Sequence, residues 1–457
     1  MTTTPSPPTF KDRVLRAGGW AFGGIIAGHM IRLGGNLILT RLLAPEMFGI
    51  MTIIYVLMSG FALFTDIGLN QSIIQSRRGD DPPYLNTAWI VQIGRGALIW
   101  TLALVLSGVL YVFGQYQWLP TGSVYADPLL PLVIAAYSIT QLITGFQSTK
   151  VALARRKIAL ALLAKLDVLS QSITLILITI WALLSPSIWA LVCGTIIGAL
   201  LNLLIYHALL PGPANRFQWD PQAFKEIIGF GKWIFLSSIL GFLTFNADRL
   251  LLGGLIDAHQ LGLYSIAFLF VSFPQLMLAQ LAIRVAFPAL SEVARENPAK
   301  MREIYYKFRI PFDLVQLFLA GFLFTFGSSL IRLLYDSRYI DAGPIMDILA
   351  VGIIATRYQL VENCFIAIGK PKLLTPLYAA RLLSVFSIVP ALHALHQFTG
   401  ALWGIVIAPF LTIPFVLYLK HKHHLLDWKK ELLVLPILLV GAGTGKLISM
   451  LLDILGL

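Results

Sequence analysis

The sequence predicts an all-α polytopic membrane protein, because it is rich in apolar residues, poor in charge, and carries its basic residues in alternate loops. Of its 457 residues, 57% are hydrophobic and 12% are charged, whereas soluble domains are roughly 45–50% apolar and about 25% charged. Such a composition cannot cover a water-facing surface, and it also excludes disorder and collagen-like repeats. A membrane-spanning helix needs about 20 apolar residues, so this length suits about a dozen spans.

The first half of the chain contains six apolar runs that are long enough to span. The first run follows basic residues, as the apolar part of a signal peptide does. It is too long for such a segment and more spans follow it, so we expect it to be retained. Residues 1–10 are expected to form a disordered cytoplasmic tail. The six runs are residues 13–43, 47–69, 87–113, 129–152, 158–184 and 187–210.

The second half contains six further runs and one additional run at its end. A polar, proline-rich linker at residues 211–224 separates the halves, and residues 421–457 hold a basic loop and the last run. The seven runs are residues 225–255, 258–290, 303–335, 343–368, 373–395, 399–419 and 431–453.

The loops between the runs alternate in charge. With the N-terminus in the cytoplasm, most of the 34 lysine and arginine residues lie in cytoplasmic loops, whereas 114–128, 185–187 and 394–400 contain none. Cytoplasmic loops of membrane proteins carry an excess of Lys and Arg, so the alternation predicts a cytoplasmic N-terminus. The C-terminus then lies outside if the thirteenth run is a true span. The net charge of +12 thus reports topology, and nucleic acid is not an expected partner.

An internal repeat supports a two-lobed architecture. At an offset of 213 residues, Gly49 aligns with Gly262, and the turn 44–49 aligns with 257–262. The offset equals six spans, an even number, so both halves have the same orientation. We therefore expect pseudo-symmetric six-helix bundles at residues 11–210 and 225–420, around a central cavity and followed by the extra C-terminal span.

Cofactor and metal signals are missing from the sequence. Cys193 and Cys364 lie singly in apolar runs, so we expect neither a disulfide framework nor a zinc site. The stretch 441–446 resembles part of a phosphate loop but lacks its full spacing. No extramembrane region is large enough for a catalytic domain, so we do not expect an enzyme.

Ionisable residues inside spans are costly and mark cavities or pairs. By distance along their runs, Arg32 and Arg357 lie nearest the midplane, with His29 close by. One interpretation is a cationic cavity that binds an anionic group such as a phosphate, for which arginine is suited. The other is that each arginine pairs with a carboxylate on a neighbouring helix. His29 could relay protons or form a structural hydrogen bond.

Four other intramembrane charges are candidates for coupling or gating. Asp66 and Arg95 are predicted near the cytoplasmic ends of their spans, where they could also form a structural pair. Asp167 and Arg381 occupy the same place in the repeat with opposite charges. They could form a pair that closes the lobes, or each could pair separately within its own lobe.

Several motifs in a fixed order resemble a known family. They are residues 40–49 (TRLLAPEMFG), 66–75 (DIGLNQSIIQ), 86–89 (NTAW) with Gln92 and Arg95-Gly96, and 152–157 (ALARRK). In this order and spacing they are similar to the polysaccharide flippases of the multidrug/oligosaccharidyl-lipid/polysaccharide exporter superfamily. The resemblance covers residues 11–420.

The resemblance implies a bacterial inner-membrane flippase that works by alternating access. Its substrate would be an undecaprenyl-pyrophosphate-linked oligosaccharide for exopolysaccharide, capsule or O-antigen synthesis. Partners would be the bilayer, a proton or sodium as coupling ion, and the polysaccharide polymerase machinery. Related flippases bind pyrophosphate through cavity arginines, for which Arg32 and Arg284 are the counterparts by span.

A multidrug/cation antiporter of the same superfamily is the alternative function. A cation substrate favours unpaired acidic residues in the cavity, and the intramembrane charges here are more often basic than acidic. A membrane-embedded glycan synthase is disfavoured by the short loops.

Overall fold

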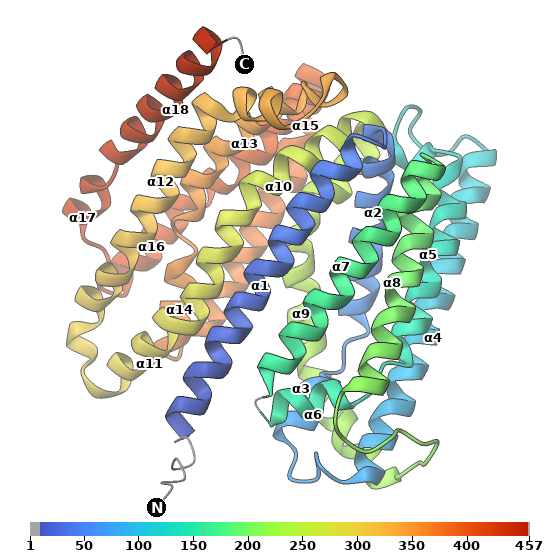
Figure 1. The fold of residues 1–457 in the computed structure, drawn as a ribbon. Helices are drawn as coiled ribbons and strands as arrows, with labels where there is room; N and C mark the ends of the chain where they lie inside the picture. The colour runs from blue at the N-terminus through green and yellow to red at the C-terminus, as the bar shows by residue number, and fades with distance from the viewer. Residues whose placement is uncertain (1–9, 158, 456–457) are drawn as a thin grey trace, which may run out of the picture. The chain divides into compact units, whose positions relative to one another are not determined.

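The computed structural model describes residues 10–157 and 159–455, with side chains described outside 10–18, 21, 230–238 and 240. Within these ranges the chain is helical and contains no strand (Figure 1). The fold class predicted from composition is therefore confirmed. Nearly all of the predicted N-terminal tail lies outside the described residues.

Internal contacts divide the chain into two compact units. The first unit comprises residues 1–43, 54–119 and 126–239. Within it α1 packs on α7, α7 on α8, and α4 on α5. Its helices are α1 (Phe10–Thr40), most of α2 (Pro45–Phe64), α3 (Leu69–Gln75), α4 (Pro82–Gln115), α5 (Leu129–Gly145), α6 (Lys150–Arg156), α7 (Leu160–Leu184), α8 (Ile188–Leu209) and the first part of α9 (Pro221–Leu255).

The second unit comprises residues 44–53, 120–125 and 240–457. Here α12 packs on α13 and α18, α10 on α13, and α13 on α15. Its helices are the start of α2, the rest of α9, α10 (Ala258–Leu281), the π-helical η2 (Ala282–Ala286), α11 (Phe287–Glu296), α12 (Met301–Leu334), α13 (Ala342–Thr356), α14 (Leu360–Ala367), α15 (Leu374–Leu411), α16 (Ile413–Lys422), α17 (Trp428–Leu433) and α18 (Pro436–Leu455), with short 3-10 turns between some of them.

The boundary between the units falls inside helices rather than in the predicted linker. It divides α2 after Ile53 and α9 after Ile239. The linker at 211–224 belongs wholly to the first unit, where Arg216 and Asp220 bind back to α4 through Asn86 and Thr87.

Helix α15 is broken between the predicted runs 373–395 and 399–419, and the second of these runs continues into α16. Gln397 has a φ of 52°, and the helical dihedrals are interrupted at His396 and Gln397. The two halves fold back on each other, because a Cβ on Gly404 would lie 2.8 Å from the Cα of Val389. This antiparallel reversal ends the first segment of α15, and the second segment approaches the length of a span only together with α16 (Ile413–Lys422).

Ten stretches of the described chain are long and apolar enough to cross a membrane, and the bent pair α5–α6 would make an eleventh. Each of the thirteen predicted ranges falls mainly on helical backbone, and some contain a short break such as 65–68, 146–149 or 357–359. Two features explain why the number of these stretches is lower than the thirteen predicted runs. The side chains of α9 are described only in part, and the stretch Pro371–Lys422 contains both halves of α15.

The repeated turns contact each other reciprocally within the second unit. A Cβ on Gly49 would lie 2.9 Å from the carbonyl carbon of Ala258, and a Cβ on Gly262 would lie 3.1 Å from the Cα of Pro45. Pro45 and Ala258 are themselves separated by 213 residues, as are Gly49 and Gly262. Gly49 contacts Ala258, the repeat counterpart of Pro45, and Gly262, the repeat counterpart of Gly49, contacts Pro45 itself. Such reciprocal contacts are the pattern that a two-fold axis produces. The offset found in the sequence is the spacing of these contacts.

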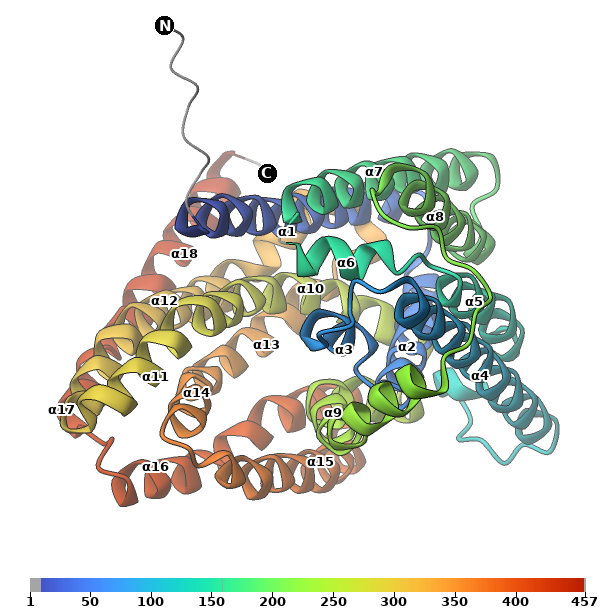
Figure 2. The ribbon, with the colours of Figure 1, turned by 90° about the horizontal axis from the view of Figure 1, so that it is seen from below.

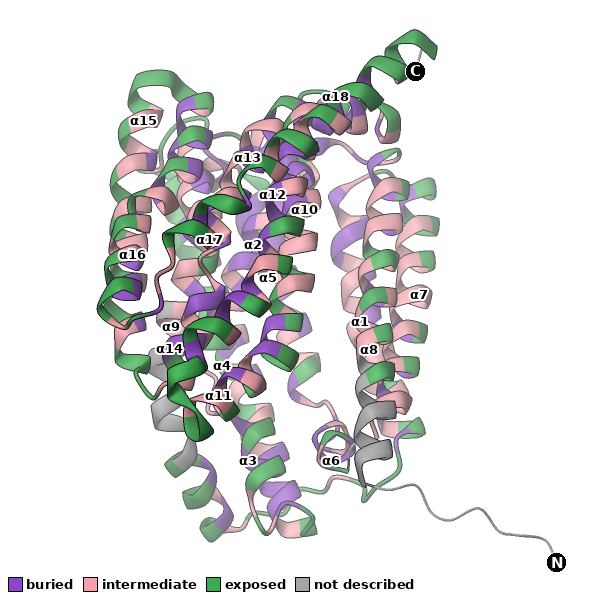
Figure 3. Cartoon of the chain, turned by 90° about the vertical axis from the view of Figure 1, so that its left-hand side faces the viewer, coloured by how far each residue is buried: buried purple, intermediate pink, exposed green. Residues whose placement is uncertain are grey.

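The last helix, α18, packs closely along α12. Gly441 and Gly445 lie against the backbone of α12, where a Cβ on Gly445 would be 2.6 Å from the carbonyl oxygen of Phe322. Thr325 donates a hydrogen bond to the Ala442 carbonyl at 2.9 Å. Small residues allow such close helix packing in membranes, and they explain the glycine-rich stretch 441–446. The opposite face of α18 is exposed and apolar (Figure 3).

Candidate functional site

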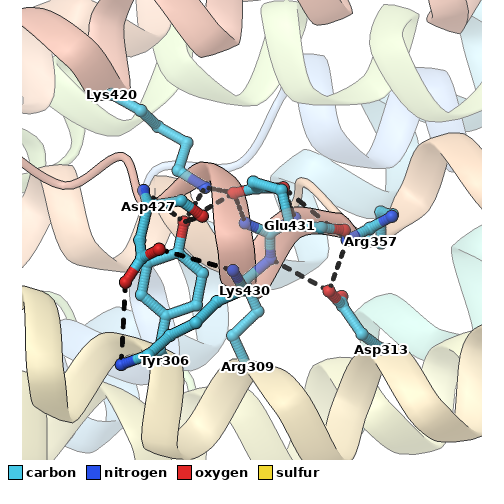
Figure 4. A network of polar contacts seen from close by, with 8 residues as sticks. All are labelled: Tyr306, Arg309, Asp313, Arg357, Lys420, Asp427, Lys430 and Glu431. Carbon is cyan, nitrogen blue, oxygen red and sulfur yellow. Dashed lines mark hydrogen bonds and ion pairs between the residues drawn. The ribbon is translucent and has the colours of Figure 1, made fainter. Parts of the chain in front are cut away.

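A buried ionic network in the second unit joins α12, α16 and α17 (Figure 4). Glu431 lies at its centre and accepts hydrogen bonds from Arg309, with Nη2 at 2.7 Å, and from the Tyr306 hydroxyl at 2.6 Å. Lys420 forms a further ion pair with the same carboxylate. Arg309 and Lys420 have no exposed surface, and Glu431 is 4% exposed. Such charges are tolerated only when they are paired.

Arg357 completes this network from the end of α13. Its guanidinium donates to Asp313 at 2.9 Å and to the backbone carbonyl of Glu431 at 3.0 Å. Asp313 also lies 3.2 Å from Arg309 Nε. Of the two interpretations open from the sequence, the structure favours the ion pair with neighbouring helices for Arg357.

Three cations share two carboxylates in this network, and aromatic rings surround the excess charge. Lys420 Nζ lies 5.0 Å from the centre of the Tyr305 ring, and the Arg309 guanidinium lies 4.9 Å from that of Tyr358. Ring faces attract cations at this distance. The buried part of the network therefore holds three cations with two carboxylates, and Lys430 and Asp427 form a further ion pair at its edge.

Lys420 and Glu431 were not found as site residues from the sequence. The sequence places Lys420 at the start of a basic loop and Glu431 at the first residue of the last predicted run, where both charges are expected to face water. Only the packing of α17 beneath α12 brings Glu431 into the unit, and no local pattern signals this.

A polar cavity lies beside the network, also within the second unit. Its volume is about 200 Å³, and Arg357 forms part of its wall. Helices α10 and α12 contribute Gln275 and Gln316. Segment 356–363 contributes Gln359, Glu362 and Asn363, and α15 contributes Tyr378 and Arg381.

The cavity contains an ion pair of its own. Arg381 lies 2.7 Å from Glu362, and the Tyr378 hydroxyl donates to the other oxygen of that carboxylate at 2.8 Å. Asp167, the predicted partner of Arg381 across the lobes, instead accepts a hydrogen bond from Tyr206. Each of the two predicted residues is therefore paired within its own unit.

Arg284 lies next to the cavity and is exposed. It belongs to the π-helical segment η2, whose preceding residues Ala282 and Ile283 line the cavity wall. Arg284 has no ion-pair or hydrogen-bond partner among the residues that the structure describes. Single π-helical turns are frequent at functional sites.

Arg32 and His29 lie one turn apart on α1, in the first unit. Arg32 is exposed, and its Nε donates to the Gly28 carbonyl at 3.4 Å. His29 is half-buried beside it. Arg32 is thus an exposed intramembrane arginine of the first unit, as Arg284 is of the second.

Asp66 and Arg95 do not form an ion pair with each other within 4.0 Å, although both side chains lie in the described part of the chain. Asp66 accepts a hydrogen bond from the Gly68 backbone amide at 3.0 Å. Arg95 donates to the Ala62 carbonyl at 2.5 Å and to Thr65 at 3.2 Å. Both residues therefore stabilise the end of α2 and the turn into α3.

The motif residues that carry the family resemblance form hydrogen bonds at the loop end of the first unit, where α3 and α6 lie side by side (Figure 2). Trp89 donates to the Phe146 carbonyl at 3.0 Å, and Gln92 donates to the Gln147 carbonyl at 2.9 Å. Arg156 Nη1 donates to the Ser76 carbonyl at 2.7 Å just beyond α3. These residues satisfy carbonyl groups that helix ends leave without partners.

The linker is fastened at the same end. Arg78 binds Asp220 at 2.5 Å, and this contact holds the pKa of the Asp220 carboxyl below its usual value. Asp220 also accepts a hydrogen bond from the Gln222 amide at the start of α9. The motifs thus have a structural role, which their residue types alone did not reveal.

Comparison with known proteins places these features in a family context. The family model described as polysaccharide biosynthesis protein matches residues 38–344. The lipopolysaccharide biosynthesis protein WzxC of Escherichia coli is 22% identical over 89% of this chain and 82% of its own length. The succinoglycan biosynthesis transport protein ExoT of Rhizobium meliloti is 22% identical over 76% of this chain and 67% of its own.

Two solved structures share the fold. The lipid II flippase MurJ in an inward closed conformation matches with a TM-score of 0.67 and 15% identity, over 96% of both chains. An inward-facing multidrug resistance MATE transporter also matches with a TM-score of 0.67 and 15% identity, over 87% of this chain and 94% of its own. At this identity the likeness concerns the fold alone.

Proposed function

Because the chain belongs to the family of polysaccharide biosynthesis proteins, we propose that it is a flippase for an undecaprenyl-pyrophosphate-linked oligosaccharide. It moves the lipid-linked repeat unit from the cytoplasmic to the outer leaflet, for exopolysaccharide, capsule or O-antigen synthesis. The observation that carries this proposal is the family match over residues 38–344. The relatives named for lipopolysaccharide and succinoglycan biosynthesis support it.

The physical problem is the polar headgroup. Sugar and pyrophosphate cannot cross hydrocarbon unaided, since an unpaired charge at the bilayer centre costs several kcal/mol or more. Exposed arginines within spans supply positive charge and bidentate donors for phosphate oxygens. Arg284 and Arg32 have this exposure, whereas Arg357 is committed to Asp313 and Glu431. Arg284 and Arg32 therefore bind the pyrophosphate, and Arg357 supports the cavity wall.

The protein acts as a multi-pass protein of the bacterial inner membrane with its N-terminus in the cytoplasm. A proton or sodium gradient drives the movement, and the released substrate passes to the polymerase machinery. His29, beside Arg32, is the candidate proton carrier. Coupling or gating would involve the local contacts of four residues. During transport these contacts have to be kept or replaced by others; the residues are Asp66, Arg95, Asp167 and Arg381.

A gene deletion tests this function. Loss of the protein is expected to deplete surface glycan and to accumulate the lipid-linked repeat unit in the cytoplasmic leaflet. Arg284→Ala and Arg32→Ala are expected to reduce complementation about tenfold or more, the cost of one charged hydrogen bond. Arg295→Ala, an exposed arginine on α11, is the matched control and should complement fully.

The result that rejects the flippase is equally specific. Normal surface glycan in the deletion strain, together with raised sensitivity to cationic drugs, would assign the protein to the antiporters instead.

A further inference from the structure

The charged side chains that line the cavity of the second unit already form ion pairs with one another or with neighbouring residues. Arg357 is bound to Asp313, and Arg381 is bound to Glu362. A pyrophosphate that entered this cavity would therefore compete with the buried Asp313 and the partly buried Glu362 for the two guanidinium groups. Breaking a buried ion pair is costly. The cavity is consequently a poor site for a second anion.

The lining side chains that form neither a hydrogen bond nor an ion pair in the described chain include three neutral amides, whereas Arg357, whose Nε lacks a partner, is held by its other guanidinium nitrogens. The side chains of Gln316, Gln359 and Asn363 line the cavity and form no hydrogen bond with any residue in the described part of the chain. Gln316 is only 7% exposed. Gln359 and Asn363 are half-buried, and the amide groups of all three side chains keep some accessible surface. An amide both donates and accepts hydrogen bonds, so these three side chains are suited to a ligand that does the same. Sugar hydroxyl groups do both.

The size and the walls of the cavity fit a single sugar. Its volume of about 200 Å³ is several times the roughly 30 Å³ of one water and lies below the roughly 300–1,000 Å³ of sites for drug-sized ligands. Phe245, Phe312 and Tyr378 add aromatic surface to the lining. A few polar groups on an apolar, aromatic wall are typical of sites that orient a small ligand.

The cavity adjoins the exposed cation of this unit. Arg284 follows directly after Ile283, which lines the wall. A pyrophosphate bound at Arg284 would hold the sugar attached to it beside the cavity.

We propose that the cavity bounded by Gln316, Gln359 and Asn363 is a subsite for the sugar that is linked directly to the pyrophosphate. This assignment rests on the proposed flippase function and adds to it a division of labour: Arg284 binds the charge, and the neutral amides bind the first sugar. The amides thereby favour a glycosylated carrier over the bare carrier.

Binding to two matched lipids tests the subsite. The purified full-length protein in lipid nanodiscs is titrated with undecaprenyl pyrophosphate and with the same carrier bearing one N-acetylhexosamine, and dissociation constants are measured by tryptophan fluorescence. The wild type should bind the glycosylated carrier about tenfold more tightly or better, the yield of one or two hydrogen bonds. Gln316→Leu combined with Asn363→Leu should abolish that difference and leave binding of the bare carrier unchanged.

Two further variants complete the design. Arg284→Ala should weaken binding of both lipids by the same factor. Gln260→Leu, which removes an amide at the far end of α10 and away from the cavity, should change neither. Retained binding of the bare carrier also shows that the double variant is folded, and the single variants Gln316→Leu and Asn363→Leu serve if it is not.

The contrary results are distinguishable. Equal wild-type affinity for both lipids, or a sugar-dependent difference that survives the double substitution, overturns the subsite and leaves the flippase function standing. Equal weakening of both lipids by the double substitution would show that the cavity binds pyrophosphate. Binding of neither lipid by the wild type overturns the subsite and the proposed function together.

Discussion

At the scale of single residues, exposure separates two kinds of intramembrane arginine. Arg309 and Arg357 are buried and bound to carboxylates, whereas Arg284 and Arg32 are exposed within spans. Position along a span suggested Arg357 as a ligand residue, because depth can be read from the sequence. Its partners Asp313 and Glu431 come from other helices, and only the tertiary fold brings them near.

Removing the central carboxylate should destabilise the second unit. Glu431→Gln leaves Arg309, Lys420 and Arg357 with Asp313 as their one acidic partner, and breaking a buried pair typically costs about 3–5 kcal/mol. We expect a clearly lower melting temperature in detergent, followed by tryptophan fluorescence. Glu296→Gln at an exposed position is the control and should melt like the wild type. An unchanged melting temperature for Glu431→Gln would mean that the network is not a stabilising element.

At the scale of elements, glycine occurs where the backbones of two helices approach each other too closely for a side chain. The crossing of α2 and α10 at Gly49 and Gly262 leaves no space for a side chain. The sequence revealed this pair through its spacing of 213 residues, but it could not show that the two copies touch. Likewise the sequence shows that the stretch 441–446 is rich in glycine. Only the close packing of α18 on α12 explains why glycine stands at Gly441 and Gly445.

Adding a methyl group at the crossing should destabilise the protein. In Gly262→Ala the new Cβ would collide with Pro45, and overpacking of this kind costs about 1–3 kcal/mol. Gly49→Ala should have a similar effect, because the contacts are reciprocal. The matched control is Gly443→Ala on α18, where a Cβ meets nothing within 4 Å. The melting temperatures of the three variants check this, and a Gly262→Ala protein as stable as the Gly443→Ala protein would refute the close crossing.

At the scale of the whole molecule, the sequence predicted the helical class and the positions of the spans well. Apolar runs and proline- or glycine-containing breaks are local signals, so the ranges fall mainly on the observed helices. The division into six-helix bundles at 11–210 and 225–420 stays a prediction, and the units that internal contacts define do not follow the same boundary. The boundary lies inside α2 and α9, because contacts rather than loops define a unit, and contacts are not visible in the sequence. The family motifs pointed to the family before their contacts were known.

The predicted topology can be tested with single cysteines in a Cys193→Ser/Cys364→Ala background. Thr121 and Ala214 are exposed and lie in loops predicted on opposite sides of the membrane. A membrane-impermeant maleimide should label Thr121→Cys in intact spheroplasts and Ala214→Cys only after permeabilisation. The reverse pattern would invert the assigned orientation, and labelling of both in intact cells would disprove the span arrangement between them.

Transport itself is the most direct test of the central claim. The purified protein is reconstituted in vesicles with an undecaprenyl-pyrophosphate-linked disaccharide that carries a fluorescent label on its sugar, and an impermeant quencher is added outside under an imposed proton or sodium gradient. We expect the inner-leaflet label to be lost as well as the outer-leaflet label, with Arg284→Ala about tenfold slower, as expected for one lost charged hydrogen bond. If inner-leaflet label persists as it does in protein-free vesicles under either gradient, the protein is not a flippase for this class of lipid.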